Sequence, residues 1–362
     1  MFKNLFGQKS DVSGKHQSKP QAKMNVQYSD VLAKFCAQYD VPNLTELVKI
    51  EDEQVRLPFK LELLEDELKS INHNLSIQYD YALATLNRTH QNPRAQIKHI
   101  IAVASGKGGV GKSTVSVNLA RALKQLGADV GVLDADIYGP SIPLMLGLAG
   151  QQPEAIDDKW MKPLVSKEGI KTISIGYLVD PKKAAIWRGP MASKALTQLF
   201  NETVWGELDY LIIDLPPGTG DIQLTLMQSM PLSTSIVVTT PQNIALADAE
   251  KALAMFNELK IPVAGIVENM SVHTCSQCGH QEAIFGEKGG QSLAVGHHTK
   301  LLASLPLDIK IRETMDKGDG SGFNSADLFA GYRNIAIKLA TSLYLQARNN
   351  PAQQSIPVTQ VD

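Results

Sequence analysis

Long apolar runs, charge of one sign and an apolar leader segment are all lacking in this sequence. The 362 residues contain no uninterrupted apolar run of about 18 residues, which excludes a membrane-spanning helix. The 35 Lys and Arg nearly balance the 37 Asp and Glu, so the net charge of −2 favours neither nucleic acid nor membrane as a partner. The first 20 residues contain no apolar stretch of the roughly 7 to 15 residues that a secretion signal needs, and we expect a cytoplasmic protein.

Cysteine is also scarce. Cys36, Cys275 and Cys278 are too few for a disulfide framework. The last two are three positions apart, and in a reducing compartment this spacing indicates metal or redox chemistry. Cys36 lies in a predicted helix, AKFCAQY, where a small residue is more often part of the core than a ligand.

Composition divides the chain into four segments. Residues 1–25 form a basic segment, with five Lys and one Asp in the first 23 positions, that is predicted to be disordered. Residues 26–90 form a small α/β module, 91–347 a larger domain and 348–362 a polar tail, with a polar linker at 87–93. Within the module we expect helices over 31–41 and 67–75 and, between them, a strand over 55–63.

The larger domain alternates apolar strands with amphipathic helices, which predicts a doubly wound, mostly parallel α/β sheet covered on both faces. The expected strands are 99–104, 129–134, 170–175, 209–214, 234–240, 262–267 and 301–305. The expected helices are 112–126, 190–203, 221–229, 244–259 and 325–347.

A phosphate-binding loop, the P-loop, is predicted at residues 106–113. Its sequence GKGGVGKS fits G-x-x-x-x-G-K-[ST] and lies between a predicted strand and a predicted helix, as the motif requires. The alternative is a glycine-rich turn that only joins the two elements, and such a turn would not require this context. The glycines let backbone N–H groups turn toward phosphate oxygens. Lys112 brings a positive charge to the β/γ-phosphates, and Ser113 offers its hydroxyl to Mg²⁺. The expected nucleotide contacts are Gly106, Lys107, Gly108, Gly109, Val110, Gly111, Lys112, Ser113 and Thr114.

Lys107 is a second lysine in the same loop. It cannot easily reach its own γ-phosphate if Lys112 occupies that place, but it can project across a dimer interface and act as an arginine finger does. The alternative is a solvated surface lysine. The first interpretation requires a homodimer.

Carboxylates end two of the predicted strands near the P-loop. Asp136 is the candidate that orients the attacking water, and Asp134 the candidate for the Mg²⁺ shell, because ligands bind at the carboxyl ends of parallel strands. The alternative is that both are turn or cap residues. Asp214 follows a buried apolar run, the Walker B arrangement in which an acid holds a water of Mg²⁺.

The loop resembles that of the deviant Walker A ATPases, the group of the Min and Par positioning proteins and the nitrogenase iron protein. This resemblance implies a nucleotide sandwich dimer with Lys107 acting in trans. Asn269, at the end of the strand VAGIVEN, matches the position where these ATPases hold the adenine edge. An Asn that ends a strand is equally often a turn residue.

The cysteine pair in HTCSQCGH allows three interpretations. A common iron–sulfur cluster needs four thiolates, so a [4Fe–4S] cluster requires a second copy of the chain or further ligands. The pair also resembles half a zinc ribbon. A thioredoxin-like dithiol or an inert turn is the third possibility.

Taken in order, the motifs GKGGVGKST, DADIYGPSIP, WRGPMASKAL, DLPPGTGDIQLTL, TTPQ and ENMSVHTCSQCGHQEAIFG resemble the Mrp/ApbC (Mrp/Nbp) iron–sulfur cluster carrier family over about residues 97–325. The resemblance implies a P-loop ATPase fold, ATP with Mg²⁺, slow hydrolysis, and a homodimer. It also implies a cluster on Cys275 and Cys278 that passes between scaffold proteins and apoproteins. Residues 26–90 are similar to an iron–sulfur assembly domain only in size and in the order of their elements.

Two other functions were weighed. A zinc-binding partition or positioning ATPase without cluster transfer would need a basic amphipathic terminal helix or a basic patch, yet residues 326–348 hold only three basic residues. An electron-transfer reductase like the nitrogenase iron protein has widely separated single cysteines. A late C-x-x-C pair therefore favours delivery over electron transfer.

Overall fold

The computed structural model describes residues 19–51, 53–80, 95–179, 187–323 and 329–349. The predicted linker 87–93 and most of both predicted terminal segments lie outside these residues. Residues 19–25 do not follow the prediction of disorder, because helix α1 (Lys19–Tyr39) includes them. Pro20 suits the first turn of a helix, and Gln, Ala, Lys and Met are good helix formers, so composition alone was a poor guide here.

The larger domain contains an eight-stranded sheet whose strands are parallel except for β6 at one edge. All seven predicted strands are confirmed; β6 is an addition. In their order across the sheet the strands are β13 (Leu301–Ser304), β10 (Val263–Glu268), β9 (Thr234–Thr239), β4 (Ala95–Ala104), β8 (Gly206–Asp214), β5 (Val130–Asp134), β7 (Lys171–Ser174) and β6 (Leu164–Val165).

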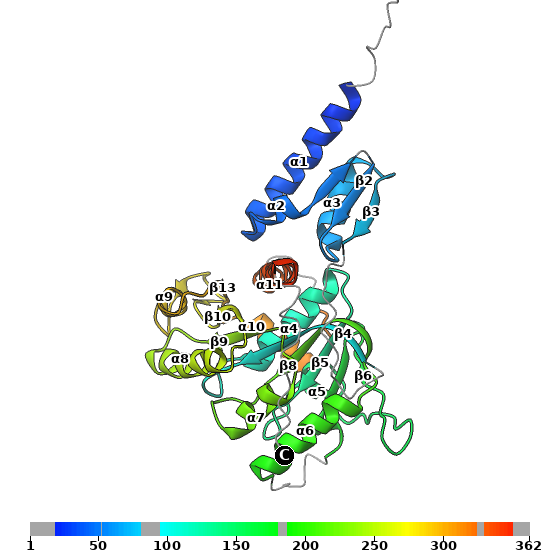
Figure 1. The fold of residues 1–362 in the computed structure, drawn as a ribbon. Helices are drawn as coiled ribbons and strands as arrows, with labels where there is room; N and C mark the ends of the chain where they lie inside the picture. The colour runs from blue at the N-terminus through cyan, green and yellow to red at the C-terminus, as the bar shows by residue number, and fades with distance from the viewer. Residues whose placement is uncertain (1–18, 52, 81–94, 180–186, 324–328, 350–362) are drawn as a thin grey trace, which may run out of the picture.

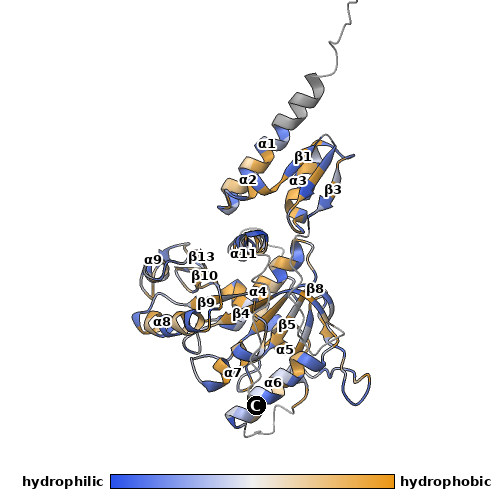
Figure 2. Cartoon of the chain, in the orientation of Figure 1, coloured by the Kyte–Doolittle hydropathy of each residue, from blue (hydrophilic) through white to orange (hydrophobic). Residues whose placement is uncertain are grey.

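Helices cover both faces of this sheet, with α4 and α11 on one side and α6 and α7 on the other (Figure 1). The central strands are buried and apolar in nearly continuous runs, as parallel sheets with two covered faces require (Figure 2). The helices are α4 (Lys112–Gln125), α5 (Ile142–Met145), η1 (Ile175–Tyr177), α6 (Gly189–Glu202), α7 (Asp221–Ser229), α8 (Asn243–Glu258), α9 (Gly289–Gly296), α10 (Ile309–Lys317) and α11 (Ala330–Asn349).

Four helical elements described in the larger domain were not predicted: the short α5 and η1, and the longer α9 and α10. The sequence of α9, GGQSLAVG, is short and glycine-rich, so it has no clear helical periodicity. Helix α10 does carry a start signal, since the side chain of Asp308 accepts a hydrogen bond from the N–H of Lys310 at 2.7 Å. The predicted helix 325–347 corresponds to α11, and residues 324–328 lie outside the described residues.

The N-terminal module contains α1, α2 (Leu44–Leu47), α3 (Glu62–Ile71) and a small sheet of β1 (Lys49–Glu51), β2 (Gln54–Leu57) and β3 (Ser76–Tyr79). The predicted strand 55–63 is too long, because Pro58 ends β2 and the acidic residues Glu62 and Glu65 favour the first turn of a helix. The predicted helix 67–75 is the second half of α3 followed by a turn.

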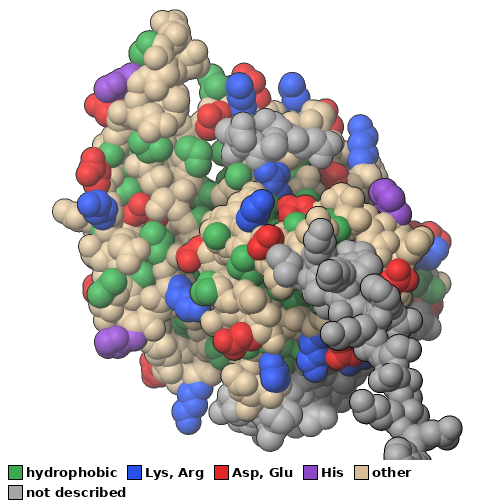
Figure 3. Space-filling model, turned by 90° about the horizontal axis from the view of Figure 1, so that it is seen from above, with side chains coloured by type: hydrophobic (Ala, Val, Ile, Leu, Met, Phe, Trp, Pro, Cys, Tyr) green, Lys and Arg blue, Asp and Glu red, His purple; other side chains and the backbone are tan. Residues whose placement is uncertain are grey.

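The module packs against α11 and the far end of α4 (Figure 1). Lys60 forms ion pairs with Asp129 at 3.0 Å and Asp209 at 3.1 Å, and the N–H of Glu62 donates to the carbonyl of Leu126 just beyond α4. A continuous cluster of buried apolar side chains spans both parts. On the face seen in Figure 3, acidic and basic side chains are interspersed, in keeping with the small net charge.

Arg121 anchors the helix that follows the P-loop. Its side chain is 2% exposed, and its Nε lies 2.9 Å from Oε1 of Glu168. Its Nη2 donates to the carbonyl of Met145 at 3.0 Å, next to α5. A single buried guanidinium thus ties α4 to the β6–β7 loop and to α5.

Replacing Arg121 with Ala should lower the free energy of unfolding by about 3 kcal/mol, because it breaks a largely buried ion pair and leaves a cavity. Urea unfolding of the full chain measures this loss. The control is Arg312→Ala, since Arg312 pairs with Asp316 where both side chains are 60% exposed, and a change below about 0.5 kcal/mol is expected there. Equal losses in the two variants would contradict the assignment.

Candidate functional site

The P-loop connects β4 to α4 in the conformation that its glycines allow. Gly109 and Gly111 have φ values of 81° and 84°, in the left-handed region that favours glycine. Gly111 is the N-cap of α4, and no side chain caps that helix. The first N–H groups of α4 are therefore directed at the position where a phosphate would sit, as the P-loop motif predicts.

A fully buried carboxylate, Asp214, lies at the end of β8 beside the start of α4. Its Oδ2 is 2.8 Å from Nζ of Lys112 and accepts a hydrogen bond from Oγ of Ser113 at 2.6 Å. Its Oδ1 accepts a hydrogen bond from Oγ of Ser116 at 2.7 Å. The hydroxyl of Ser113 and the carboxylate of Asp214 are the kind of oxygen donors that Mg²⁺ prefers, so the residues fit the ion that the sequence predicts.

Asp134 lies opposite Asp214 in the register of β5 and β8. Its carboxyl accepts hydrogen bonds from Oγ of Ser174 at 2.9 Å and from the N–H of Asp136 at 3.1 Å. Burial raises the pKa of Asp134 to about 7, and the charge of Asp214 adds to this. The carboxyl thus fixes the turn after β5, and a contact with Mg²⁺ remains a prediction.

Asp136 lies on this turn, closer to the surface than Asp134. Burial raises the pKa of its carboxyl, while the charge of Lys112 opposes the increase. Asp136 is therefore in the electrostatic reach of the residue expected at the γ-phosphate. Its role in orienting water remains a prediction.

Lys107 is partly exposed and lies beside the start of α8. Its Nζ donates to Oε1 of Gln242 at 3.3 Å, and its carbonyl accepts a hydrogen bond from Oγ of Ser105 at 2.9 Å. The neighbouring Gly106 has no room for a Cβ, which would lie 2.2 Å from the backbone of Asp248. The loop is thus pressed against α8, with the Lys107 side chain at its outer edge.

Asn269 braces the P-loop from the end of β10. Its side chain is 5% exposed, and Nδ2 donates to the carbonyl of Val110 at 2.9 Å. Its own N–H donates to the carbonyl of Thr239 at 2.7 Å. The structure therefore places Asn269 against the loop, and contact with adenine remains a prediction.

Three contacts of the site were missed in the sequence: Ser116 on Asp214, Ser174 on Asp134 and Gln242 on Lys107. Ser116 lies four residues after Lys112, so helical spacing alone would place both on one face of α4. Ser174 ends β7 and Gln242 is the N-cap of α8, and the partner of each is far away in sequence. No local signal identifies their partners.

Cys275 and Cys278 lie in the turn of a short hairpin of β11 (His273–Thr274) and β12 (Gln281–Glu282). The N–H of Cys275 donates to the carbonyl of His280 and the N–H of Gly279 to the carbonyl of Cys275, both at 2.9 Å. Hydrogen bonds from the backbone N–H of Cys278, and to a smaller extent from that of Gln277, lower the pKa of the Cys275 thiol. This turn favours the thiolate, the form that binds metal.

The two cysteines lie three positions apart in this turn, Cys275 partly exposed and Cys278 exposed. Within the described ranges, no group of three or more His, Cys, Asp or Glu side chains is arranged to hold a metal ion. Cys36 is buried, and its Sγ accepts a hydrogen bond from Oγ1 of Thr45 at 3.3 Å, which confirms it as a core residue.

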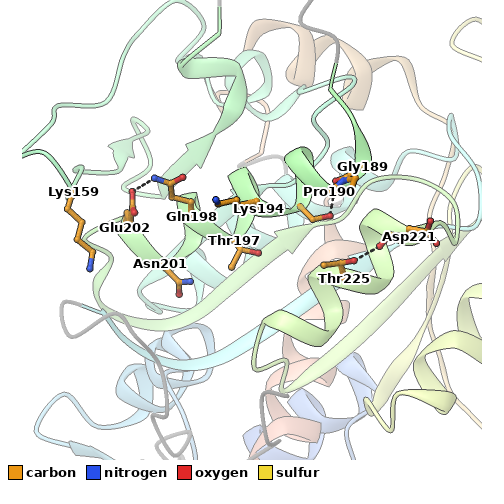
Figure 4. A pocket seen from close by; sticks show the side chains of 11 residues that line it. Lys159, Gly189, Pro190, Lys194, Thr197, Gln198, Asn201, Glu202, Asp221 and Thr225 are labelled. Carbon is orange, nitrogen blue, oxygen red and sulfur yellow. Dashed lines mark hydrogen bonds between the residues drawn. The ribbon is translucent and has the colours of Figure 1, made fainter. Parts of the chain in front are cut away.

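A separate groove of about 970 Å³ lies between α6 and α7 (Figure 4). Its lining shares no residue with the P-loop or the cysteine turn, and it mixes the basic Lys159 and Lys194 with the acidic Glu202 and Asp221. Such mixed charge selects no ligand class. None of the helices that the structure describes is both long and apolar enough to cross a membrane.

Gly111→Ala should weaken nucleotide binding about tenfold or more, because an L-residue is strained at this φ and its Cβ would lie 2.2 Å from Nδ2 of Asn269. Calorimetric titration with ADP and Mg²⁺ measures the change. Gly150→Ala is the matched control: its φ is 78°, but no atom lies within 4 Å of the added Cβ. Normal nucleotide affinity in Gly111→Ala would refute the placement of the loop.

Residues 96–340 match the model of the ParA group described as the NUBPL iron-transfer P-loop NTPase family. The iron–sulfur cluster carrier protein of Escherichia coli K12 is 53% identical over 290 residues, which cover 79% of this chain and 77% of the relative.

Solved structures give the same fold. A nucleotide-binding protein of Archaeoglobus fulgidus, solved in complex with ADP, is 39% identical with a TM-score of 0.56, covering 63% of this chain and 89% of that one. The cell division ATPase MinD of Pyrococcus furiosus is 21% identical with a TM-score of 0.51, covering 67% and 98%. The chain therefore belongs to the iron-transfer family of P-loop NTPases, together with the iron–sulfur cluster carrier proteins.

Proposed function

We propose that this protein is an ATP-dependent iron–sulfur cluster carrier. Two copies of the chain hold a [4Fe–4S] cluster between them and transfer it to recipient apoproteins, with slow hydrolysis of ATP. The observation that carries the proposal is the presence, in one chain of this family, of a complete P-loop site and an exposed cysteine turn that favours the thiolate.

The number of sulfur ligands supports a homodimer. One chain contributes Cys275 and Cys278, whereas a cluster of the common kind takes four thiolates. Cys36 is buried in the N-terminal module and holds a hydrogen bond there. A second copy supplies the missing pair by symmetry, in an isologous contact.

Each residue of the proposed nucleotide site has its own role in binding or hydrolysis. Lys112 binds the β/γ-phosphates, Ser113 and Asp214 hold Mg²⁺ directly or through water, and Asp136 orients the attacking water. Mg²⁺ when bound neutralises charge on the phosphates. Asp134 supports the turn that carries Asp136, and Asn269 contacts adenine at the edge of the loop that it braces.

A short path joins the two sites. Asn269 contacts the P-loop, and the chain leaves β10 directly after it toward the cysteine turn. On the way, the N–H of Ser271 donates to the carbonyl of Leu305, and the N–H of Leu307 donates to the carbonyl of Val272. Six positions separate Asn269 from Cys275, so movement of the P-loop can reach the cluster ligands through one segment.

The partners are apo iron–sulfur proteins that receive the cluster and scaffold proteins that supply it. We place this exchange in the cytoplasm, where thiols stay reduced. The competing function is a zinc-binding partition or positioning ATPase without cluster transfer. It is favoured by the resemblance of the cysteine turn to half a zinc ribbon.

Anaerobic reconstitution with iron and sulfide should load the wild-type chain with about four iron atoms per dimer, as four thiolates require. Absorption spectra and metal analysis measure this. Cys275→Ser and Cys278→Ser should abolish the cluster and retain ADP binding, while the control Cys36→Ser should load normally. Zinc at about one atom per two chains, with no cluster, would favour the competing function.

Lys107 should act on the nucleotide of the partner subunit. Lys107→Ala and Asp136→Ala should each lose most ATP hydrolysis, while a mixture should recover about a quarter of wild-type activity. Half the dimers are then mixed, and each mixed dimer has one site with both groups. Steady-state phosphate release measures the recovery. No recovery in a mixture shown to exchange subunits would place Lys107 on its own nucleotide.

A further inference from the structure

Three side chains contact Asp214, and they approach from two sides. Lys112 and Ser113 both contact Oδ2, at 2.8 and 2.6 Å. Ser116 alone among the described side chains donates to Oδ1, at 2.7 Å. Ser116 is 0% exposed and lies one helical turn further along α4 than Lys112.

Binding of nucleotide changes two of these three contacts. In the proposed function Lys112 turns to the phosphates and Ser113 to Mg²⁺, so neither can hold Asp214 as it does here. A buried carboxylate without hydrogen-bond partners is costly and free to rotate. The hydrogen bond from Ser116 to Asp214 remains after nucleotide binds, because Ser116 has no role toward the phosphates or Mg²⁺.

We propose that Ser116 is a positioning residue that fixes the Asp214 carboxylate for Mg²⁺ throughout the nucleotide cycle. The inference rests on the proposed Mg²⁺-nucleotide site and adds to it a residue that touches neither nucleotide nor metal. With Oδ1 held by Ser116, Oδ2 stays directed at the position between Lys112 and Ser113. Oδ2 would then be oriented in advance to hold Mg²⁺, directly or through water.

The single hydroxyl proton of Ser116 has two acceptors within reach. Oδ1 of Asp214 lies at 2.7 Å and the backbone carbonyl of Lys112 at 3.1 Å. The carboxylate is the closer acceptor and the charged one, so the hydroxyl donates its hydrogen bond to Asp214. A serine that only bonded back to the preceding turn of its helix would have no effect on Mg²⁺, and this difference makes the assignment testable.

The test measures how ADP binding by the full chain depends on Mg²⁺. ADP is titrated calorimetrically in EDTA and at a series of free Mg²⁺ concentrations. In Ser116→Ala the Mg²⁺ concentration that gives half of the gain in affinity should rise about tenfold or more, as expected for a lost hydrogen bond to a charged group. Affinity in EDTA should stay within about twofold of wild type, since Ser116 does not face the nucleotide.

The matched control is Ser235→Ala. Ser235 lies on β9 and is also 0% exposed. Its Oγ donates to the carbonyl of Pro262 at 3.2 Å. This variant loses a buried hydroxyl of the same kind and should keep the wild-type dependence on Mg²⁺. Ser116→Thr retains the hydroxyl and should restore the wild-type midpoint relative to Ser116→Ala.

An unchanged Mg²⁺ midpoint in Ser116→Ala overturns the proposal, as does an equal increase in Ser235→Ala. If Ser116→Ala does not fold, Ser116→Cys decides, because its weak donor should also raise the midpoint and an unchanged value overturns the proposal. Wild-type protein that binds ADP with Mg²⁺ but never holds a cluster would refute the carrier function and leave this assignment standing.

Discussion

The arrangement of the site depends on the burial of one charged carboxylate. Asp214 is 0% exposed, and removing such a group from water costs several kcal/mol unless it is paired and hydrogen-bonded. The ammonium of Lys112 and two serine hydroxyls provide that compensation. Because all three lie in the first turns of α4, satisfying Asp214 also fixes the helix that carries the P-loop against β8.

A second buried carboxylate lies across from it on the neighbouring strand. Two charges of the same sign would repel strongly there, and the pKa of about 7 means that Asp134 is largely protonated below neutral pH. Its folded-state pKa lies above the ordinary value of 3.8, so its contribution to stability is full below pH 3.8 and is lost as the pH rises through about 7. Below about pH 7 the sheet thus accommodates two acids by keeping Asp134 largely neutral.

Much of this architecture follows from local patterns. Seven apolar strands and the P-loop were predictable because continuous buried runs and the G-x-x-x-x-G-K-[ST] spacing are properties of short segments. The contacts that orient the site were not predictable, since Ser174 and Gln242 meet partners that lie 40 and 135 positions away in sequence. Asn269 was predicted to hold adenine from the end of its strand, and only the packing after β10 shows that its side chain supports Val110.

The cysteine turn lies between two very short strands, and on its N-terminal side His273 forms a β-bridge with Leu307. Its strands β11 and β12 are two residues long, and such a small ribbon is marginal in water. In the proposed carrier, ligation of the cluster by Cys275 and Cys278 therefore contributes to the folding of this segment, as metal does in small metal-dependent domains. In that carrier, release of the cluster removes this contribution, so the empty and the loaded forms differ in the local order of the cysteine turn.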